Sequence, residues 1–148
     1  KERGHIFTWH LVGDGPDRAM LEELIVEYGI SQQMILYGEL QNPYRILASA
    51  DLVAMVSRYE GLCGVINESK VFSLPLVATE VSGIFEQLVD GDGGIVCPQD
   101  EVQIEESLSR VIRDAPLRRA LANDHLNPGI LCDESKIVAI ESIIDRAG

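Results

Sequence analysis

Two carboxylates, those of Glu60 and Glu68, lie in the segment 57–70, SRYEGLCGVINESK, among small and apolar residues. Paired carboxylates can serve as general acid and base, or they can accept hydrogen bonds from the hydroxyl groups of a ligand. In one continuous helix, eight residue steps would place the second carboxylate about 80° around the axis and about 12 Å along it from the first. The two groups could not then act on a single atom.

Gly61 and Gly64 favour a different arrangement, in which Glu60 lies in a loop and a helix begins near Cys63 or Gly64. Glu60 would then point into a cleft from the loop, and Glu68 would reach that cleft from the first or second helical turn. The structural alternative is that Glu60 only stabilises the helix N-terminus by its charge and that Glu68 faces water. Cys63 is predicted to be a small apolar filler rather than a nucleophile.

A second candidate is the loop GDGPD, residues 13–17. Gly13 and Gly15 would let the backbone approach a ligand, and the helix that follows would offer unpaired N–H groups to an anion. The loop resembles half of a dinucleotide-binding fingerprint, but Arg18 occupies the place of the third glycine. A ligand-facing loop and a tight strand-to-helix turn both fit this pattern, whereas a Walker loop is excluded because no Gly-Lys-Ser/Thr follows.

The elements that must position these residues follow from the alternation of short apolar runs with longer amphipathic stretches. We expect a Rossmann-like α/β fold, with a doubly wound parallel sheet of about five strands flanked by helices and with further helices after the last strand. Such sheets bind ligands outside the carboxyl ends of their strands. Strands are expected at 6–13, 34–38, 51–57, 76–81 and 94–98, and helices at 16–29, 43–49, 63–73, 83–89, 101–113, 115–125 and 133–146.

Composition restricts the possible partners. The chain has 148 residues, 46% of them hydrophobic, which favours one globular domain, and its formal net charge of -12 opposes binding to nucleic acid or to an anionic membrane surface. No apolar run approaches the roughly 20 residues needed to span a bilayer. The histidines lack metal-ligand spacing and the cysteines form no Cys-x-x-Cys pair, so we expect no metal site and a cytoplasmic location.

The segment 50–98 closely resembles the nucleotide-sugar-binding half of GT-B retaining glycosyltransferases, in the group called glycosyltransferase family four. The shared order is an apolar strand, a Ser, Glu-Gly at 60–61, a second Glu at 68, a Gly-Ile-x-Glu turn at 83–86 and Asp-Gly-x-x-Gly at 90–94. The stretches LVGDGPDRAMLEEL, ILYGEL and ILASADL extend the resemblance from about Thr8 to Leu121.

The resemblance implies a function for each carboxylate. Glu68 would bind the ribose hydroxyls of a nucleotide sugar, and Glu60 would lie near the transferred sugar and act in catalysis. Backbone N–H groups at the helix start would face the diphosphate and stabilise charge on the leaving group, which would suit a metal-free mechanism without a cofactor. These N–H groups belong to Leu62, Cys63, Gly64 and Val65.

Other loops would complete the donor site by the same resemblance. The base would rest near Gly38 and Glu39, with Gly13 and Gly15 bordering its pocket. The turn at Gly83 and Glu86 would lie beside the donor as a second group of candidates. On local sequence alone, Ser82 is predicted to cap the helix that follows this turn.

The resemblance predicts that residues 1–148 are a donor-binding domain, truncated on its N-terminal side and lacking the acceptor-binding domain. The family's diphosphate-binding Arg and Lys lie upstream of the matching segment, and Arg58 and Lys70 are not their equivalents. The whole enzyme would transfer a sugar from a UDP or GDP carrier to a hydroxyl acceptor with retention, in polysaccharide biosynthesis. The enzyme would work in the cytoplasm, and an association of the parent protein with the inner face of a membrane is left open. This chain alone would be inactive.

Two alternatives remain at the level of sequence. An NAD-dependent oxidoreductase would use the GDGPD loop, with Glu39 near the expected distance for a ribose ligand. A non-catalytic interaction domain would keep the fold without the pocket. The first alternative leaves the string from Glu60 to Glu68 unexplained.

Overall fold

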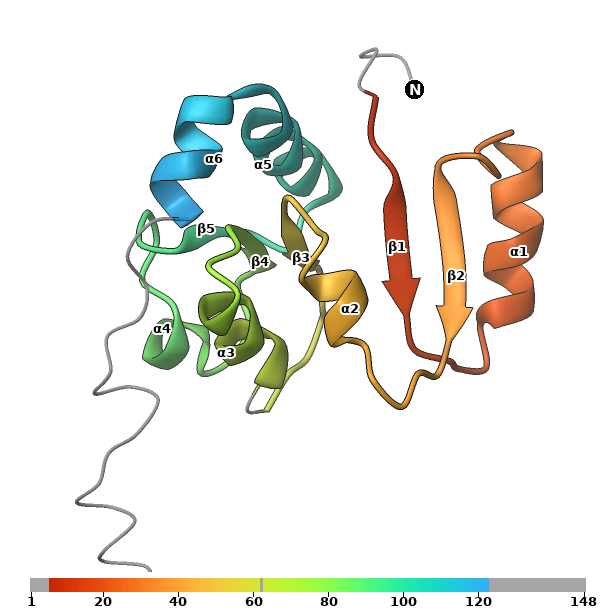
Figure 1. Ribbon diagram of the computed structural model, residues 1–148, viewed down its shortest axis with the longest axis horizontal. Helices are drawn as coiled ribbons and strands as arrows, with labels where there is room; N and C mark the ends of the chain where they lie inside the picture. The colour runs from red at the N-terminus through yellow and green to blue at the C-terminus, as the bar shows by residue number, and fades with distance from the viewer. Residues whose placement is uncertain (1–5, 62, 123–148) are drawn as a thin grey trace, which may run out of the picture. The chain divides into compact units, whose positions relative to one another are not determined.

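The computed structural model describes residues 6–61 and 63–122, and the chain divides into two compact units, residues 1–50 and 51–148 (Figure 1). Both units contain parallel strands flanked by helices, which confirms the predicted Rossmann-like α/β class. The helix predicted at 133–146 lies outside the described residues.

The first unit is built on a pair of parallel strands. Parallel neighbours need a crossover connection, and α1 supplies it. Leu11 of β1 pairs with Leu36 of β2, and Leu21 of α1 lines a hollow with both, so this face of the strand pair lies toward the helix. The elements are β1 Trp9–Val12, α1 Arg18–Glu27, β2 Met34–Gly38 and α2 Tyr44–Leu47.

The second unit is built on a three-stranded parallel sheet in the order β3-β4-β5. All residues of the central strand β4 are buried, as expected for a strand covered on both faces. The elements are β3 Val53–Met55, α3 Gly64–Val71, β4 Leu76–Thr79, α4 Ile84–Gln87, β5 Gly94–Cys97, α5 Glu101–Arg113 and α6 Ala115–Ala122.

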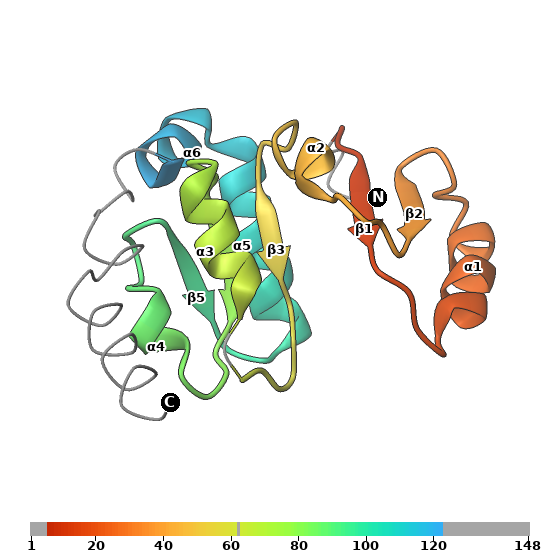
Figure 2. The ribbon, with the colours of Figure 1, turned by 60° about the horizontal axis from the view of Figure 1, so that its bottom comes forward.

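The two faces of this sheet bury different helices. Val77 of β4 clusters with Val111 of α5 and Leu121 of α6 on one face. Because side chains alternate along a strand, Ala78 and its β3 partner Met55 lie on the opposite face, where Met55 contacts the residue just before α3. Figure 2 shows α3 and α5 on opposite sides of the sheet.

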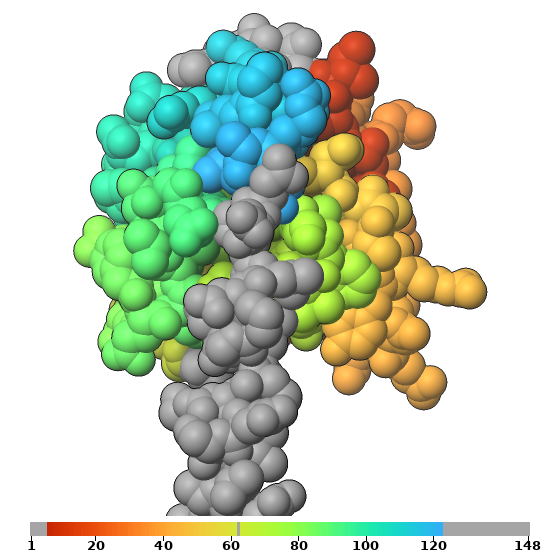
Figure 3. Space-filling model, turned by 60° about the vertical axis from the view of Figure 1, so that its left-hand side comes forward, coloured from red at the N-terminus to blue at the C-terminus, as the bar shows by residue number. Residues whose placement is uncertain are grey.

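Local signals explain where α5 and α6 begin. Asp100 caps α5 by accepting hydrogen bonds from the N–H groups of Val102 and Gln103, and Asp114 accepts one from Leu117 in the first turn of α6. The surfaces of the two helices adjoin in Figure 3. The predicted bounds of α5, residues 101–113, are confirmed. Both the residue that caps this helix and its apolar side chains are neighbours in the sequence.

Most strands and short helices are briefer than predicted. β1 ends at Val12 because the next residue, Gly13, has φ of 125°, which interrupts extended backbone. α4 spans only Ile84–Gln87, since Leu88 is already extended at φ -137° and ψ 126°. Apolar runs therefore located the elements, whereas backbone changes at their ends set the lengths.

Gly94 begins β5 directly opposite Leu76 of β4. A Cβ on Gly94 would collide with the backbone carbonyl of Leu76, which cannot move without disturbing the central strand. We therefore expect Gly94→Ala to reduce the free energy of unfolding by about 1–3 kcal/mol in urea denaturation. Gly61→Ala is the matched control in the same unit, because a Cβ there would meet no atom within 4 Å. Equal losses in both variants would contradict the steric explanation.

Candidate functional site

The carboxyl ends of β3 and β4 are joined by a buried hydroxyl group. Thr79, the last residue of β4, is 1% exposed, and its Oγ1 donates to the carbonyl oxygens of Met55 at 3.3 Å and Ser57 at 2.5 Å. These bonds fix the backbone where β3 passes into the loop that carries Glu60. The hydroxyl therefore positions a candidate site residue without lying in the site itself.

A side-chain amide joins the loops after all three strands of the second unit. Gln99 follows β5, and its Nε2 donates to the carbonyl oxygens of Glu80 after β4 at 2.8 Å and Arg58 after β3 at 3.1 Å. Three segments that are distant in sequence are thereby held at one edge of the sheet. This is the edge where parallel α/β sheets bind ligands.

Glu60 lies in the loop between β3 and α3, as Gly61 and Gly64 predicted. Its carboxylate is half-buried and accepts a hydrogen bond from Ser57 Oγ at 2.6 Å. Ser57 is itself held through its carbonyl by Thr79. The carboxylate is therefore oriented by a short chain of contacts that begins in the buried sheet.

Glu68 lies in the second turn of α3, which begins at Gly64 as predicted. Its Oε1 is 4.0 Å from the position that a Cβ on Gly64 would occupy. The side chain thus extends along the helix toward its N-terminus, where a negative charge is favourable. This direction brings the carboxylate toward the loop that holds Glu60.

Cys63 lies between Glu60 and Glu68 in the sequence, and its side chain is buried. Burial raises the pKa of its thiol, and the carboxylates of Glu60 and Glu68 raise it further, while the N–H groups of Ile66 and Val65 oppose the shift. Glu60, in the loop before α3, and Glu68, in its second turn, thus both act electrostatically on this thiol. The protonated thiol agrees with its interpretation as a filler.

The backbone of Cys63 is paired with the side chain of Gln87, the last residue of α4. The Cys63 N–H donates to Gln87 Oε1 at 3.1 Å, and Gln87 Nε2 donates to the Cys63 carbonyl oxygen at 3.2 Å. The N–H of Cys63 thus has an acceptor within the protein, while Gly64 and Val65 are exposed in the first turn. Leu62 lies outside the described residues.

The turn before α4 contains the second group of candidates. Gly83 is the N-cap residue, with φ of 76°, and no side chain caps the helix, so the prediction that Ser82 is the cap was wrong. The positive φ explains the difference, because glycine adopts it without the strain that a Cβ would cause. Glu86 is exposed on α4.

In the first unit, Gly13 and Gly15 line a hollow of about 290 Å³, near the lower end of the volumes of ligand pockets. The Gly13 N–H donates to the Gly38 carbonyl oxygen at 2.8 Å, which joins the carboxyl ends of β1 and β2. Glu39 is exposed and is not part of the lining. The lining consists of Leu11, Val12, Gly13, Asp14, Gly15, Pro16, Asp17, Arg18, Leu21 and Leu36.

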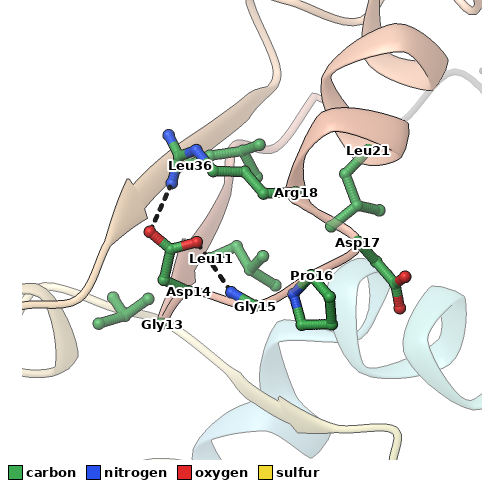
Figure 4. Close-up of a pocket in the computed structure, with 10 residues that line it drawn as sticks. Leu11, Gly13, Asp14, Gly15, Pro16, Asp17, Arg18, Leu21 and Leu36 are labelled. Atoms are coloured by element: carbon green, nitrogen blue, oxygen red, sulfur yellow. Dashed lines mark hydrogen bonds and ion pairs between the residues drawn. The ribbon is translucent and has the colours of Figure 1, made fainter.

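Charged side chains lie over this hollow (Figure 4). Asp14 accepts a hydrogen bond from the Gly15 N–H at 2.8 Å and forms an ion pair with Arg18 at 3.8 Å. Arg18 also contacts Glu22 at 2.9 Å, and its Nη1 lies 3.2 Å from where a Cβ on Gly38 would be. The loop is therefore held by contacts of its own side chains, and the cation that replaces the third fingerprint glycine lies against Gly38.

Sequence reasoning missed Thr79, Gln87 and Gln99. Each is an uncharged polar residue, and two of them, Thr79 and Gln99, lie at or just beyond the carboxyl end of a strand. That position was an available signal for residues that bind the backbone of neighbouring loops. Gln87 had no such signal, because its partner is 24 residues away.

Across 6–61 and 63–122, no group of three or more His, Cys, Asp or Glu side chains could hold a metal ion. In that same part of the chain, every helix is too short or too polar to cross a bilayer.

Residues 2–126 match the family model described as glycosyl transferases group 1. A relative from Streptomyces kanamyceticus, alpha-D-kanosaminyltransferase, is 32% identical over 125 residues, which cover 82% of this chain and 32% of the relative. The chain thus spans about a third of the length of that curated relative.

Solved structures give the same picture of the fold. Sucrose-phosphate synthase from Thermosynechococcus elongatus is similar with a TM-score of 0.80 and 20% identity, covering 93% of this chain and 38% of that chain. HepE from Anabaena, solved in complex with UDP-glucose, has a TM-score of 0.70 and 26% identity, covering 80% of this chain and 34% of that chain.

The environment of Cys63 predicts slow reaction with thiol reagents. Because the thiolate is the reacting form, we expect iodoacetamide to alkylate Cys63 slowly near neutral pH, with a midpoint above the ordinary thiol pKa of 9.0. Peptide mass spectrometry would follow this residue separately from the other cysteines. The chain unfolded in urea is the control, since burial is lost there. Equal rates in the folded and unfolded chains at neutral pH would contradict the assignment.

Proposed function

The chain belongs to the glycosyl transferases group 1 family, and from this we propose that it supplies the donor-binding part of an enzyme that transfers a sugar from a nucleotide-diphosphate sugar to a hydroxyl acceptor. The observation that carries the proposal is that Glu60 lies in the loop just before α3, while the side chain of Glu68 extends from the second turn toward the N-terminus of the same helix. Family membership favours this function over the oxidoreductase alternative.

In this proposal, Glu68 accepts hydrogen bonds from the ribose hydroxyls. A carboxylate provides two acceptor oxygens, which match two neighbouring hydroxyl donors. The half-burial of Glu68 and its direction toward the start of α3 support this assignment. A neutral amide in its place would keep only one of the two acceptors.

Glu60 is assigned to the sugar side of the donor and to catalysis. Its hydrogen bond from Ser57 Oγ holds one carboxylate oxygen and leaves the other available to the transferred sugar. A negative charge at this place would stabilise positive charge that develops on the anomeric carbon as the bond to the diphosphate breaks.

The leaving diphosphate is assigned to the first turn of α3. A helix N-terminus carries roughly half a positive elementary charge, and its first N–H groups have no partner within the helix. Gly64 and Val65 are exposed there, which supports the assignment of this turn to an anion. Stabilisation of the leaving group by these groups would need no metal ion or cofactor.

In the first unit, Gly38 and Glu39 are assigned to the base, and Gly13 and Gly15 to the border of its pocket. The short contact between the Gly13 N–H and the Gly38 carbonyl oxygen supports a shared loop edge. Leu62, Gly83 and Glu86 stay in the proposal as donor-side residues.

The acceptor would be bound by a domain outside these 148 residues. The coverage of only 32% of the kanosaminyltransferase relative supports this part of the proposal. We further propose a UDP or GDP donor, retention at the anomeric carbon, a cytoplasmic location and a setting in polysaccharide biosynthesis. This chain alone would not transfer sugar.

A nucleotide panel on the full-length parent protein tests the class of ligand. We expect UDP or GDP and their sugars to raise the melting temperature, because a ligand at 100 times its Kd adds about 2.7 kcal/mol of stability. NAD serves as the comparison ligand. Protection by NAD alone would contradict the proposal in favour of an oxidoreductase. Absence of protection by every nucleotide would favour a non-catalytic interaction domain.

Replacement of Glu68 tests the ribose assignment. We expect Glu68→Ala in the full-length protein to weaken nucleotide-sugar binding by about 10- to 100-fold in calorimetry, because a charge-assisted pair of hydrogen bonds is lost. Glu68→Gln should lose less, since one acceptor remains. Glu106→Gln, on the exposed surface of α5, is the charge-matched control. Unchanged donor affinity and transfer activity in Glu68→Ala would refute the assignment.

A further inference from the structure

We propose that Gln87 and Lys70 are positioning residues that fix the first turn of α3 for the diphosphate, an inference that rests on the proposed function. Gln87 lies at the end of α4 and Lys70 lies within α3. We call their contacts the Gln87 clamp, which consists of the pairing of the Gln87 amide with Cys63 and the hydrogen bond from Lys70 Nζ to the Gln87 carbonyl oxygen.

The first part of the clamp fixes both peptide groups of Cys63. Its N–H donates to the Gln87 amide at 3.1 Å and its carbonyl oxygen accepts from that amide at 3.2 Å. Two bonds from one planar group restrain rotation on both sides of the Cys63 Cα. The direction of the next peptide groups, those of Gly64 and Val65, depends on this restraint.

The local cap at the helix start is weak, since among the described residues only the Cys63 thiol faces the N–H groups of Ile66 and Val65. Cys63 is the N-cap residue, with φ of -88° and ψ of 104°, and its side chain makes no capping hydrogen bond. Its thiol instead donates to Met55 Sδ at 2.8 Å. Gln87 of α4, 24 residues away in the sequence, therefore holds the backbone at the start of the first turn.

The second part of the clamp is a buried cation. Lys70 is 8% exposed, and its Nζ donates to the main-chain carbonyl of Gln87. Burial lowers the pKa of Lys70, and the carboxylate of Asp92 partly offsets this. An ammonium group at such a place needs a strong acceptor, since an unpaired buried charge is costly. The carbonyl at the end of α4 provides it.

Together the two parts attach Gln87 to α3 at Cys63 and Lys70. Seven residues separate these points, which corresponds to about 10 Å along a helix axis. α4 has only four residues, too few for a stable isolated helix, so its position depends on such contacts. A shift of Gln87 would therefore move the N–H groups that face the diphosphate, while the ribose ligand Glu68 would keep its place one turn further along α3.

The test compares binding of UDP and uridine, which differ only in the diphosphate, in the full-length protein. We expect Gln87→Leu to lower the affinity for UDP by about tenfold or more, while the affinity for uridine stays unchanged, because only the phosphate contacts depend on the first turn. Lys70→Met should change the same ratio to a smaller extent and serves as the second variant if the first does not fold. Gln103→Leu, exposed on α5, is the matched control.

Amide hydrogen exchange at Cys63 provides a readout that needs no ligand. Faster exchange in Gln87→Leu than in the wild type and the control supports the clamp, and unchanged exchange overturns it. If the wild type binds UDP and the variant discriminates UDP from uridine equally well, the positioning function is overturned while the donor site stands. If the wild type binds no UDP, the proposed function fails, and the role of the clamp toward a diphosphate fails with it.

Discussion

The second unit depends on the way its three parallel strands end at one edge. Parallel strands bring their carboxyl ends together, but the loops beyond them are held only if other groups bind their backbones. Thr79 and Gln99 bind the backbones of the loops after β3 and β4 through uncharged donors. The place of Glu60 follows from these few hydrogen bonds, whereas Gln87 holds the start of α3.

The loop after β3 and the start of α3 accommodate two carboxylates in an acidic chain. Glu60 is held by a hydroxyl donor, and Glu68 extends toward the N-terminus of α3, so each has a favourable electrostatic partner. Cys63 lies between them in the sequence, and its protonated thiol adds no third negative charge. Burial of an apolar filler and stabilisation of two acids are thus achieved by the same short segment.

The sequence predicted those features that local pattern determines. The bounds of α5 followed from the alternation of apolar and polar residues, and the loop position of Glu60 and the start of α3 followed from glycines. Gln87 could not be found in this way, because its amide acts on a residue 24 positions earlier and no local spacing encodes that pairing. Ser82 showed the converse error, since a favourable cap residue was overridden by the left-handed backbone of Gly83.

The uncharged nature of the groups that hold these loops has a consequence for ionic strength. Hydrogen bonds from hydroxyl and amide groups are hardly affected by salt, whereas interactions between distant surface charges are screened beyond about 10 Å at 0.1 M ionic strength. The arrangement at the sheet edge should therefore persist as salt varies. The long-range repulsion between a chain of net charge -12 and an anionic ligand would at the same time decrease. Such a protein can keep its architecture while its encounter rate with anions rises with salt.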